Sequence, residues 1–164
     1  MTTIPSPSPL DALHDRLREP LHHFIGGEWV AGHSASPNTN PSDLSEVVGE
    51  YAQADAALTR QAIAAANGAR AIWARSTAQD RADVLERIGI EILSRREELG
   101  TLLAREEGKT LPEAVGEVAR AGQIFRFFAG EVVRASGEHL PSVRPGIEVD
   151  ITREPIGVVG IITP

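Results

Sequence analysis

The chain of 164 residues is 41% hydrophobic and 24% charged, the composition of a globular protein with one domain or part of a larger one. Its formal net charge of -7, without a basic stripe, argues against nucleic acid as a partner, and it contains no apolar run long enough to span a membrane. The absence of cysteine excludes disulfides, thiolate metal sites and a cysteine nucleophile within the chain. We therefore expect a cytoplasmic protein that binds neither nucleic acid nor a membrane.

The amino-terminal region divides into an extension and a set of short strands. Residues 1–20 are predicted to form a flexible extension because Ser and Pro alternate at its start, although the leucines of LDALHDRLRE are compatible with a short helix. The stretch HHFIGGEWVAG predicts two brief strands around Gly26 and Gly27, since glycines accept the positive φ of a tight hairpin. A loop is expected through HSASPNTNPSD, and another strand is expected in EVVGEYA.

Helices are predicted to dominate the middle of the chain. The Ala-rich stretch ADAALTRQAIAAANGARAIWARS predicts a helix that ends near Trp73. Ser76 and Gln79 have the spacing of a capping box, which predicts the start of a second helix with one apolar face and a break near Arg95. Gly108 suits the end of this helical segment.

A third helix is predicted to begin in the stretch TLPE. Thr110 and Glu113 repeat the capping-box spacing, and Pro112 is tolerated in a first turn because the helix does not need an N–H there. One face of this helix is apolar, and further apolar residues fall elsewhere, so we expect burial on more than one side. The face consists of Val115, Val118, Phe125 and Val132, and the other apolar positions are Ile124, Phe127 and Phe128.

The pattern changes to extended structure after Gly137. The stretches EHLPSV and IEVDITREP are predicted to pair as a β-ribbon about Arg144-Pro145-Gly146. Alternation places Ile147, Val149 and Ile151 on one face and Glu148, Asp150 and Thr152 on the other. The stretch GVVGIIT does not alternate, which is typical of a parallel strand covered on both faces.

General motif searches predict no catalytic or metal site. Gly108-Lys109-Thr110 ends like a phosphate-binding loop, but Leu103 stands where that loop needs a glycine and a helix precedes it. The five histidines lack metal-ligand spacing, so we expect no metal site. Gly157 and Gly160 match only half of a dinucleotide fingerprint, and close packing explains them equally well.

Taken in order, the segments resemble the amino-terminal part of an NAD(P)-dependent aldehyde dehydrogenase. The resemblance runs from about Phe24 to Pro164 through FIGGEWV, EEGKTLPEAVGEV, RFFAGE and PIGVVGIITP. The stretch from GEHLPSV to the end is similar in detail to the subgroup that acts on α-ketoglutarate semialdehyde. The resemblance implies an α/β fold class, of which this chain holds the helices, the β-ribbon oligomerisation arm and the first strand of the dinucleotide-binding sheet, but not the remainder.

The resemblance also implies a division of the chain and a chemistry. Residues 21–136 would be the helical part of the cofactor-binding domain with short amino-terminal strands. Residues 137–155 would be the ribbon arm, which implies a homo-oligomer, and residues 156–164 the truncated first strand of the sheet. In the family, a cysteine thiolate attacks an aldehyde, hydride passes to NAD or NADP, and a glutamate activates water against the thioester. These catalytic groups are expected beyond this chain, so no catalytic residue is assigned within it.

Three residues are expected to contact the cofactor. Ile162, Thr163 and Pro164 match positions whose backbone lines the nicotinamide side of NAD or NADP in the family. The expected function is therefore that of a fragment of an aldehyde-oxidising enzyme, inactive by itself, whose substrate is a small semialdehyde. The alternative is a non-catalytic helical interaction module that docks through its ribbon and terminal strand.

Overall fold

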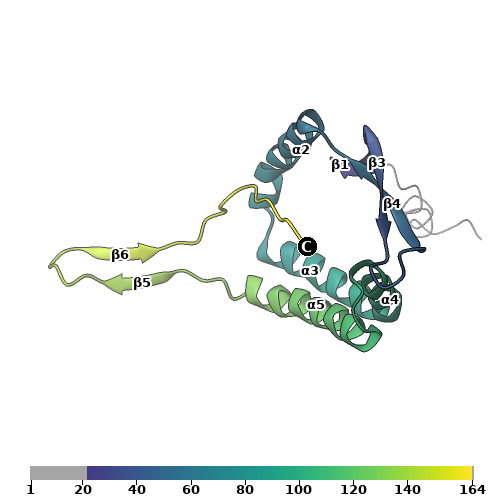
Figure 1. The fold of residues 1–164 in the computed structure, drawn as a ribbon. Coiled ribbons are helices and arrows are strands. Elements are labelled where there is room, and N and C mark those ends of the chain that lie inside the picture. Colours follow the sequence, from purple (N-terminus) through teal and green to yellow (C-terminus); the bar gives the residue numbers. More distant parts are fainter. Residues whose placement is uncertain (1–21, 164) are drawn as a thin grey trace, which may run out of the picture. The chain divides into compact units, whose positions relative to one another are not determined.

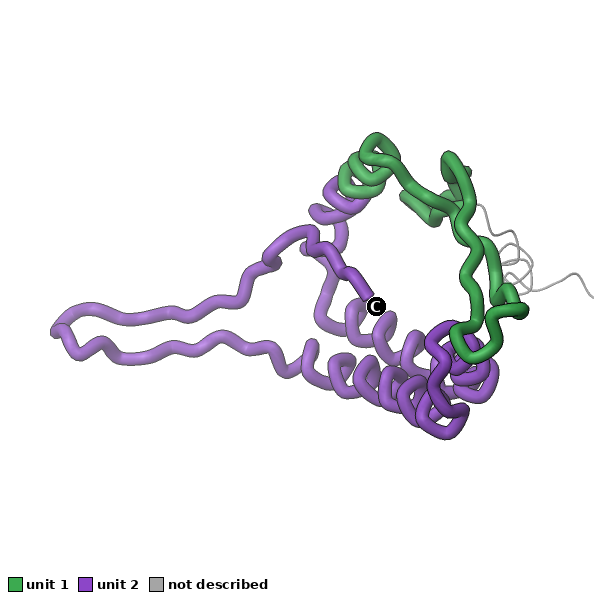
Figure 2. Tube along the Cα trace, viewed as in Figure 1, with its two compact units in different colours: residues 1–65 green, residues 66–164 purple. Residues whose placement is uncertain are grey.

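The structure is a computed structural model that describes residues 22–163. It divides into two compact units, residues 1–65 and residues 66–164 (Figure 2). Figure 1 shows short strand pairs in the first unit and helices followed by a ribbon in the second. The predicted flexible extension and its short helix, residues 1–20, lie outside the described residues.

Unit 1 opens with a two-stranded antiparallel hairpin. Strands β1 (His22–Ile25) and β2 (Glu28–Ala31) pair directly, with Phe24 opposite Trp29. Both turn glycines between the strands have positive φ, 64° at Gly26 and 89° at Gly27. The hairpin predicted from the glycine pair is confirmed.

The second strand pair contains one strand that the sequence did not predict. β3 (Ser34–Thr39) pairs antiparallel with β4 (Val47–Gln53), of which only β4 was expected. We predicted a loop across β3 because Ser, Pro and Asn are typical of turns. The prediction was wrong because pairing with β4 supplies the backbone hydrogen bonds that hold these residues in a strand. The connection is fixed by Asn40, which is 8% exposed and whose amide donates to a Glu46 carboxylate oxygen at 2.6 Å.

Helix α2 (Ala56–Ala74) begins at an aspartate cap. The backbone N–H of Leu58 donates to the Asp55 carboxylate at 2.8 Å, and this bond is the main reason that the pKa of Asp55 lies below its ordinary value. The His33 imidazole nitrogen lies 3.1 Å from the other Asp55 oxygen. The Ala-rich prediction for this helix is confirmed to its end at Ala74.

Helix α3 (Ala78–Ser94) starts one residue later than the capping box that we predicted. Thr77, not Ser76, is the N-cap, and its hydroxyl accepts from the backbone N–H of Asp80 at 3.1 Å. The Asp80 carboxylate in turn accepts from the backbone N–H of Thr77 at 3.0 Å. The prediction was wrong because it required Glu or Gln at the third helical position, whereas the shorter Asp80 also completes the box.

Helix α4 (Arg96–Glu107) is separated from α3 by a break at Arg95, as predicted. Arg95 has φ -105° and ψ 16°, which ends α3. Gly108 then ends α4 in the left-handed conformation, with φ 71°. Its backbone N–H donates to the carbonyl oxygen of Ala104 at 2.9 Å. The stop predicted at Gly108 is confirmed.

Helix α5 (Leu111–Val132) packs against both α3 and α4. Small residues make these contacts: Ala114 is fully buried, Ala129 is 5% exposed, and Gly122 is also buried. The predicted face of Val115, Val118, Phe125 and Val132 is half-buried against the neighbouring helices. The second apolar set is exposed, with Ile124 at 46%, Phe127 at 60% and Phe128 at 53%, so burial on more than one side is not seen in the described residues.

The predicted ribbon is formed by β5 (Glu138–Pro141) and β6 (Glu148–Ile151), which pair antiparallel. The turn between them includes Gly146 with φ 75°. Residues 152–163 contain neither helix nor strand. A parallel strand needs neighbouring strands, and the described residues offer none beside this segment, so the strand predicted for 156–164 stays a prediction.

Candidate functional site

The junction between α4 and α5 is organised around Lys109. Its ammonium lies 2.5 Å from a Glu107 carboxylate oxygen and 2.5 Å from one of Glu117, and these two hydrogen bonds, Glu107 first, raise the pKa of Lys109. The Lys109 side chain is only 23% exposed. This cation is therefore engaged by two carboxylates, and Gly108 caps helix α4.

Thr110 and Glu113 complete the same junction. The Thr110 hydroxyl donates to the Glu113 carboxylate at 2.7 Å, and this bond is the main cause that lowers the pKa of Glu113. The Thr110 backbone N–H also donates to the Glu113 carboxylate, but the Thr110 side chain caps no helix N–H, so only one half of the predicted capping box is found. The motif EEGKTLPE thus builds a polar connection between α4 and α5.

The terminal segment carries the residues expected to contact a cofactor. Ile162 is 98% exposed, Thr163 is exposed, and Pro164 lies outside the described residues. Among the described residues, no backbone hydrogen bond is made within or to residues 156–163. The cofactor contact expected at Ile162, Thr163 and Pro164 stays a prediction.

Two histidines of the described part of the chain, His33 and His139, pair with carboxylates. His139 Nδ1 lies 2.7 Å from an Asp150 oxygen across the ribbon, and His33 pairs with Asp55 as described above. Within residues 22–163, no group of three or more His, Cys, Asp or Glu side chains could hold a metal ion. None of the helices described there is long and apolar enough to cross a membrane.

Sequence reasoning missed one pocket. It lies in the second unit, has a volume of about 690 Å³, and is lined by part of α2 and by residues 153–159. Arg70, Arg81 and Arg153 line it together with Trp73. Arg70, Trp73 and Arg81 lie close together in the sequence, but Arg153 lies far from them, and no spacing rule joins the four residues.

Comparison with known families gives one match over most of the chain. The model of the family described as "Aldehyde dehydrogenase family" matches residues 29–164. The alpha-ketoglutaric semialdehyde dehydrogenase of Bacillus subtilis is 39% identical over 144 residues, which cover 87% of this chain and 30% of that protein. The alpha-ketoglutarate semialdehyde dehydrogenase of Haloferax volcanii is 33% identical and covers 90% and 31%. The chain thus spans about 30% of the length of these relatives.

Solved structures agree with these sequence matches. An NAD-dependent benzaldehyde dehydrogenase from Corynebacterium glutamicum superposes with a TM-score of 0.69 at 37% identity, over 79% of this chain and 28% of that one. A betaine aldehyde dehydrogenase from Staphylococcus aureus in complex with NAD+ superposes with a TM-score of 0.76 at 28% identity, over 85% and 28%. The helices and small sheets described above are therefore those of an amino-terminal part of this α/β fold.

Proposed function

This chain belongs to the aldehyde dehydrogenase family, and from that premise we propose that its protein oxidises an aldehyde to a carboxylic acid with NAD or NADP. The observation that carries the proposal is the match of one family over residues 29–164, which takes in the helices, the ribbon and the terminal segment in the family's order.

The proposed substrate is a small semialdehyde that carries an acidic group, with α-ketoglutarate semialdehyde first. This choice is supported by the names of two similar proteins, from Bacillus subtilis and Haloferax volcanii. Other similar proteins are named for glutarate semialdehyde and malonate semialdehyde, so the semialdehyde class has wider support than any one member of it.

The cofactor is proposed to lie against the backbone of Ile162, Thr163 and Pro164. The nicotinamide, when bound, accepts the hydride that leaves the aldehyde carbon. At the two described positions the side chains are exposed and the backbone is free of hydrogen bonds to other described residues, which fits close approach by a ligand. What these residues would do is position the nicotinamide ring through main-chain contacts.

The activity is tested by purifying the protein expressed from its natural gene and following NADH or NADPH absorbance. We expect reduction of cofactor that depends on α-ketoglutarate semialdehyde and is faster than with an uncharged aldehyde of similar length. Omission of the aldehyde is the control. Folded, soluble protein that reduces neither cofactor with any semialdehyde would overturn the proposal.

The chain of 164 residues alone is proposed to be inactive. The family's reaction begins with attack by a cysteine thiolate, and the chain contains no cysteine. The assay described above, applied to the chain alone, is expected to show no aldehyde-dependent cofactor reduction. Turnover by homogeneous chain at a rate that follows its concentration would contradict this.

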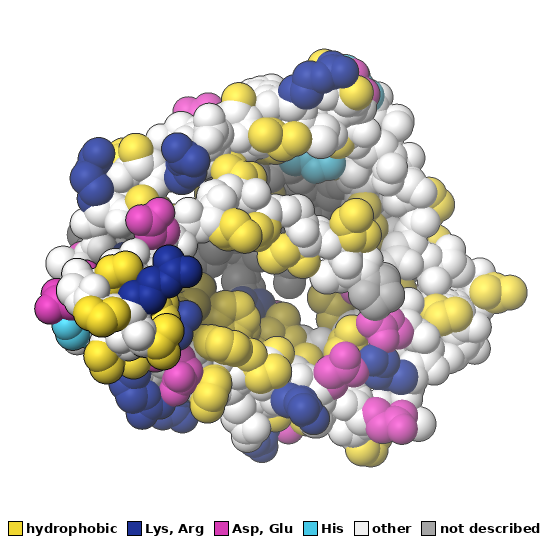
Figure 3. All heavy atoms as spheres, turned by 90° about the vertical axis from the view of Figure 1, so that its left-hand side faces the viewer, with side chains coloured by type: hydrophobic (Ala, Val, Ile, Leu, Met, Phe, Trp, Pro, Cys, Tyr) yellow, Lys and Arg dark blue, Asp and Glu magenta, His cyan; other side chains and the backbone are white. Residues whose placement is uncertain are grey.

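The ribbon, residues 137–155, is proposed to make contacts between subunits of a homo-oligomer. Its strands have no packing partner among the described elements other than each other, and apolar side chains remain exposed on it. In the space-filling view of Figure 3, hydrophobic side chains, in yellow, gather on the ribbon beside charged ones. Those at 39–48% exposure are Leu140, Ile147, Val149 and Ile151.

A non-catalytic helical interaction module is the competing candidate, and the same exposed ribbon favours it. Size-exclusion chromatography of the chain separates the two proposals, since a module gives a stable monodisperse species with a specific partner. A severed part of an enzyme is expected to aggregate through its exposed apolar surface.

The enzyme is proposed to be cytoplasmic. Cell fractionation with an antibody against the chain tests this localisation.

A further inference from the structure

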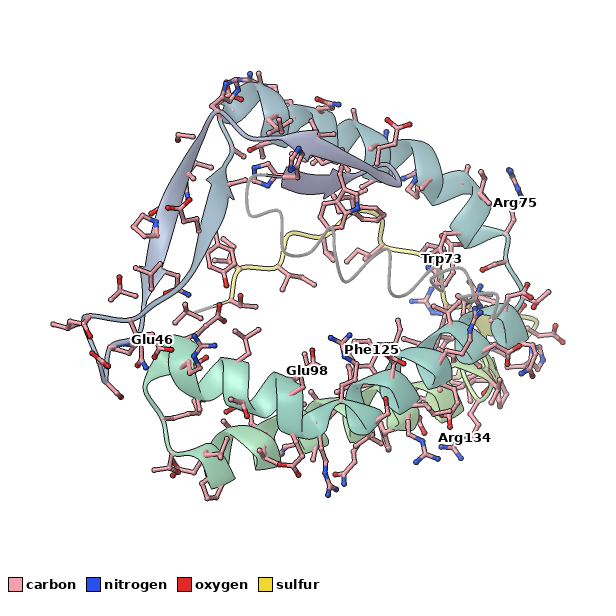
Figure 4. The ribbon with its side chains drawn as sticks, turned by 90° about the vertical axis from the view of Figure 1, so that its right-hand side faces the viewer. Glu46, Trp73, Arg75, Glu98, Phe125 and Arg134 are labelled. Atoms are coloured by element: carbon pink, nitrogen blue, oxygen red, sulfur yellow. The ribbon has the colours of Figure 1, made fainter. Side chains whose placement is uncertain are left out.

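The chain that leads from α5 into the ribbon is hydrogen-bonded to the end of the helix. Three consecutive backbone N–H groups, those of Arg134, Ala135 and Ser136, donate to the carbonyl oxygens of Glu131, Val132 and Arg134 at 3.0, 3.4 and 2.7 Å. The Arg134 guanidinium also pairs with the Glu131 carboxylate, and Figure 4 labels Arg134 at this end of α5. Residues 134–136 are therefore a continuation of the helix end and not a free linker.

The two arms of the ribbon meet at a place that we call the root, formed by Ser136 and Gly137 on the outgoing arm and Ile151 and Arg153 on the returning arm. A Cβ built on Gly137 would overlap the carbonyl oxygen of Ile151, so the two backbones lie closer than any side chain at position 137 would allow. Arg153 Nε donates to the carbonyl oxygen of Ser136 at 3.3 Å. Because Ser136 is itself bonded to the helix end, the root ties the returning arm to α5.

The length of the ribbon makes its far end sensitive to the root. Figure 1 shows β5 and β6 running away from α5 as one extended pair. A strand advances about 3.3 Å per residue, so Arg144 in the turn lies about 20 Å from Gly137, and a rotation of about 10° at the root moves the turn by about 3.5 Å. Apolar contacts require heavy atoms within about 4.0–4.5 Å, so a displacement of this size removes contacts that the far end makes.

We propose that the root is a clamp that fixes the direction in which the ribbon leaves α5, and that Gly137 and Arg153 thereby position the ribbon on a second copy of the protein. The proposal rests on the subunit contacts proposed above for residues 137–155. Gly137 permits the close approach of the two arms, and Arg153 holds the returning arm on the Ser136 carbonyl. Both contacts join groups of this chain, so they do not depend on what covers the surrounding surface.

The glycine of the clamp is tested in the whole protein expressed from its natural gene. Mass photometry of a dilution series gives the concentration at which half of the oligomer has dissociated. Gly137→Ala forces the two arms apart and is expected to raise this concentration at least about tenfold. Gly130→Ala in α5 is the matched control, because its Cβ position lies 3.7 Å from Arg134 Nη2, an ordinary contact, and it should leave the concentration unchanged. Equal values for the two variants would overturn the proposal.

The arginine of the clamp is tested by a pair of variants in the same assay. Arg153→Met keeps the aliphatic chain but removes the hydrogen bond to the Ser136 carbonyl, and it is expected to raise the dissociation midpoint about fivefold. Arg153→Lys retains an N–H donor and is expected to recover most of this loss. Circular dichroism is expected to show the same helix content in all variants, which separates loss of positioning from unfolding. A lysine variant that dissociates as readily as the methionine variant would show that the hydrogen bond has no part in assembly.

A shortened ribbon separates failure of the clamp from failure of the proposed subunit contacts. Replacing residues 139–150 by Gly-Gly joins Glu138 to Ile151, which stand opposite each other in the ribbon, and leaves the root in place. We expect this protein to dissociate. If it assembles like the wild type, the ribbon does not hold the subunits together and the clamp is overturned with it. If it dissociates while Gly137→Ala and Arg153→Met assemble like the wild type, only the clamp is overturned.

Discussion

Gly89 of α3 and Gly122 of α5 bring the two helices into backbone contact. A Cβ built on Gly89 would lie 2.8 Å from the carbonyl oxygen of Gly122, and one built on Gly122 would lie 3.1 Å from that of Gly89 and 2.7 Å from Leu93 Cγ. Neither position has room for a methyl group unless the helices separate.

The first prediction is that Gly89→Ala and Gly122→Ala each destabilise the protein by about 2 kcal/mol, because overpacking a helix crossing forces a backbone shift. Urea unfolding followed by circular dichroism measures the effect. Gly116→Ala on the same helix α5 is the matched control, since nothing lies within 4 Å of its Cβ position. That control is expected to stabilise by about 0.5–1 kcal/mol through helix propensity, and a loss as large as at Gly122 would contradict the packing explanation.

The second prediction concerns the left-handed cap between α4 and α5. Gly108 has φ 71°, so Gly108→Ala places a Cβ in a strained conformation and is expected to cost about 1–2 kcal/mol. Gly108→Asn should cost less because Asn tolerates this region better. The order of unfolding midpoints, Gly above Asn above Ala, checks the prediction, and an Ala variant as stable as Asn would refute it.

The third prediction concerns the ion pair between α3 and α5. Arg126 Nε lies 3.0 Å from a Glu86 carboxylate oxygen, with both side chains more than one third exposed. We expect a coupling free energy of about 0.2–1 kcal/mol, reduced by salt, because solvent screens exposed pairs. A double-mutant cycle of Glu86→Gln with Arg126→Met measures it, since Met retains part of the aliphatic contact with Gly89. A coupling unaffected by salt would exclude the electrostatic interpretation.

The fourth prediction is a pH dependence at the start of α3. Hydrogen bonds from the Thr77 hydroxyl and, second, its backbone N–H hold the pKa of Asp80 below its ordinary value. A lowered folded-state pKa means that the cap stabilises α3 above the unfolded value of about 4 and that this contribution is lost as the pH falls through the folded value. Asp80→Asn should therefore lose less stability than the wild type over that interval. Parallel pH profiles for the two proteins would show that Asp80 does not contribute.

Several elements followed from local sequence rules because the deciding contact lies within a few residues. The hairpin at Gly26 and Gly27, the break at Arg95 and the stop at Gly108 are of this kind. The cap of α3 was misplaced by one residue because Ser76 and Thr77 are both good caps, and only the structure shows which of them the chain uses.

The remaining features depend on contacts between distant residues. β3 forms only because β4 supplies its hydrogen bonds, and the pocket at Trp73 forms only because residues 153–159 lie beside α2. The cofactor contacts proposed at Ile162, Thr163 and Pro164 rest on family resemblance alone. Their test needs the bound nicotinamide, since an exposed segment is compatible with many partners.

The last prediction is that Val149→Lys disrupts the proposed oligomer of the enzyme. Val149 stands opposite Leu140 in the ribbon, where two apolar side chains at 39% and 42% exposure face each other without a covering element among those described. A lysine there places a charge in the proposed subunit contact, and desolvating it costs several kcal/mol unless it is paired.

Glu148→Lys is the matched control on the same strand, because the alternation of side chains puts residue 148 on the other face. Sedimentation velocity of the protein expressed from its natural gene is expected to show smaller species for Val149→Lys and unchanged species for Glu148→Lys. If both variants sediment as the wild type does, the apolar face of the ribbon does not hold the subunits together. If both dissociate, charge on the strand rather than burial of Val149 governs assembly, because the two lysines share only their charge and their strand.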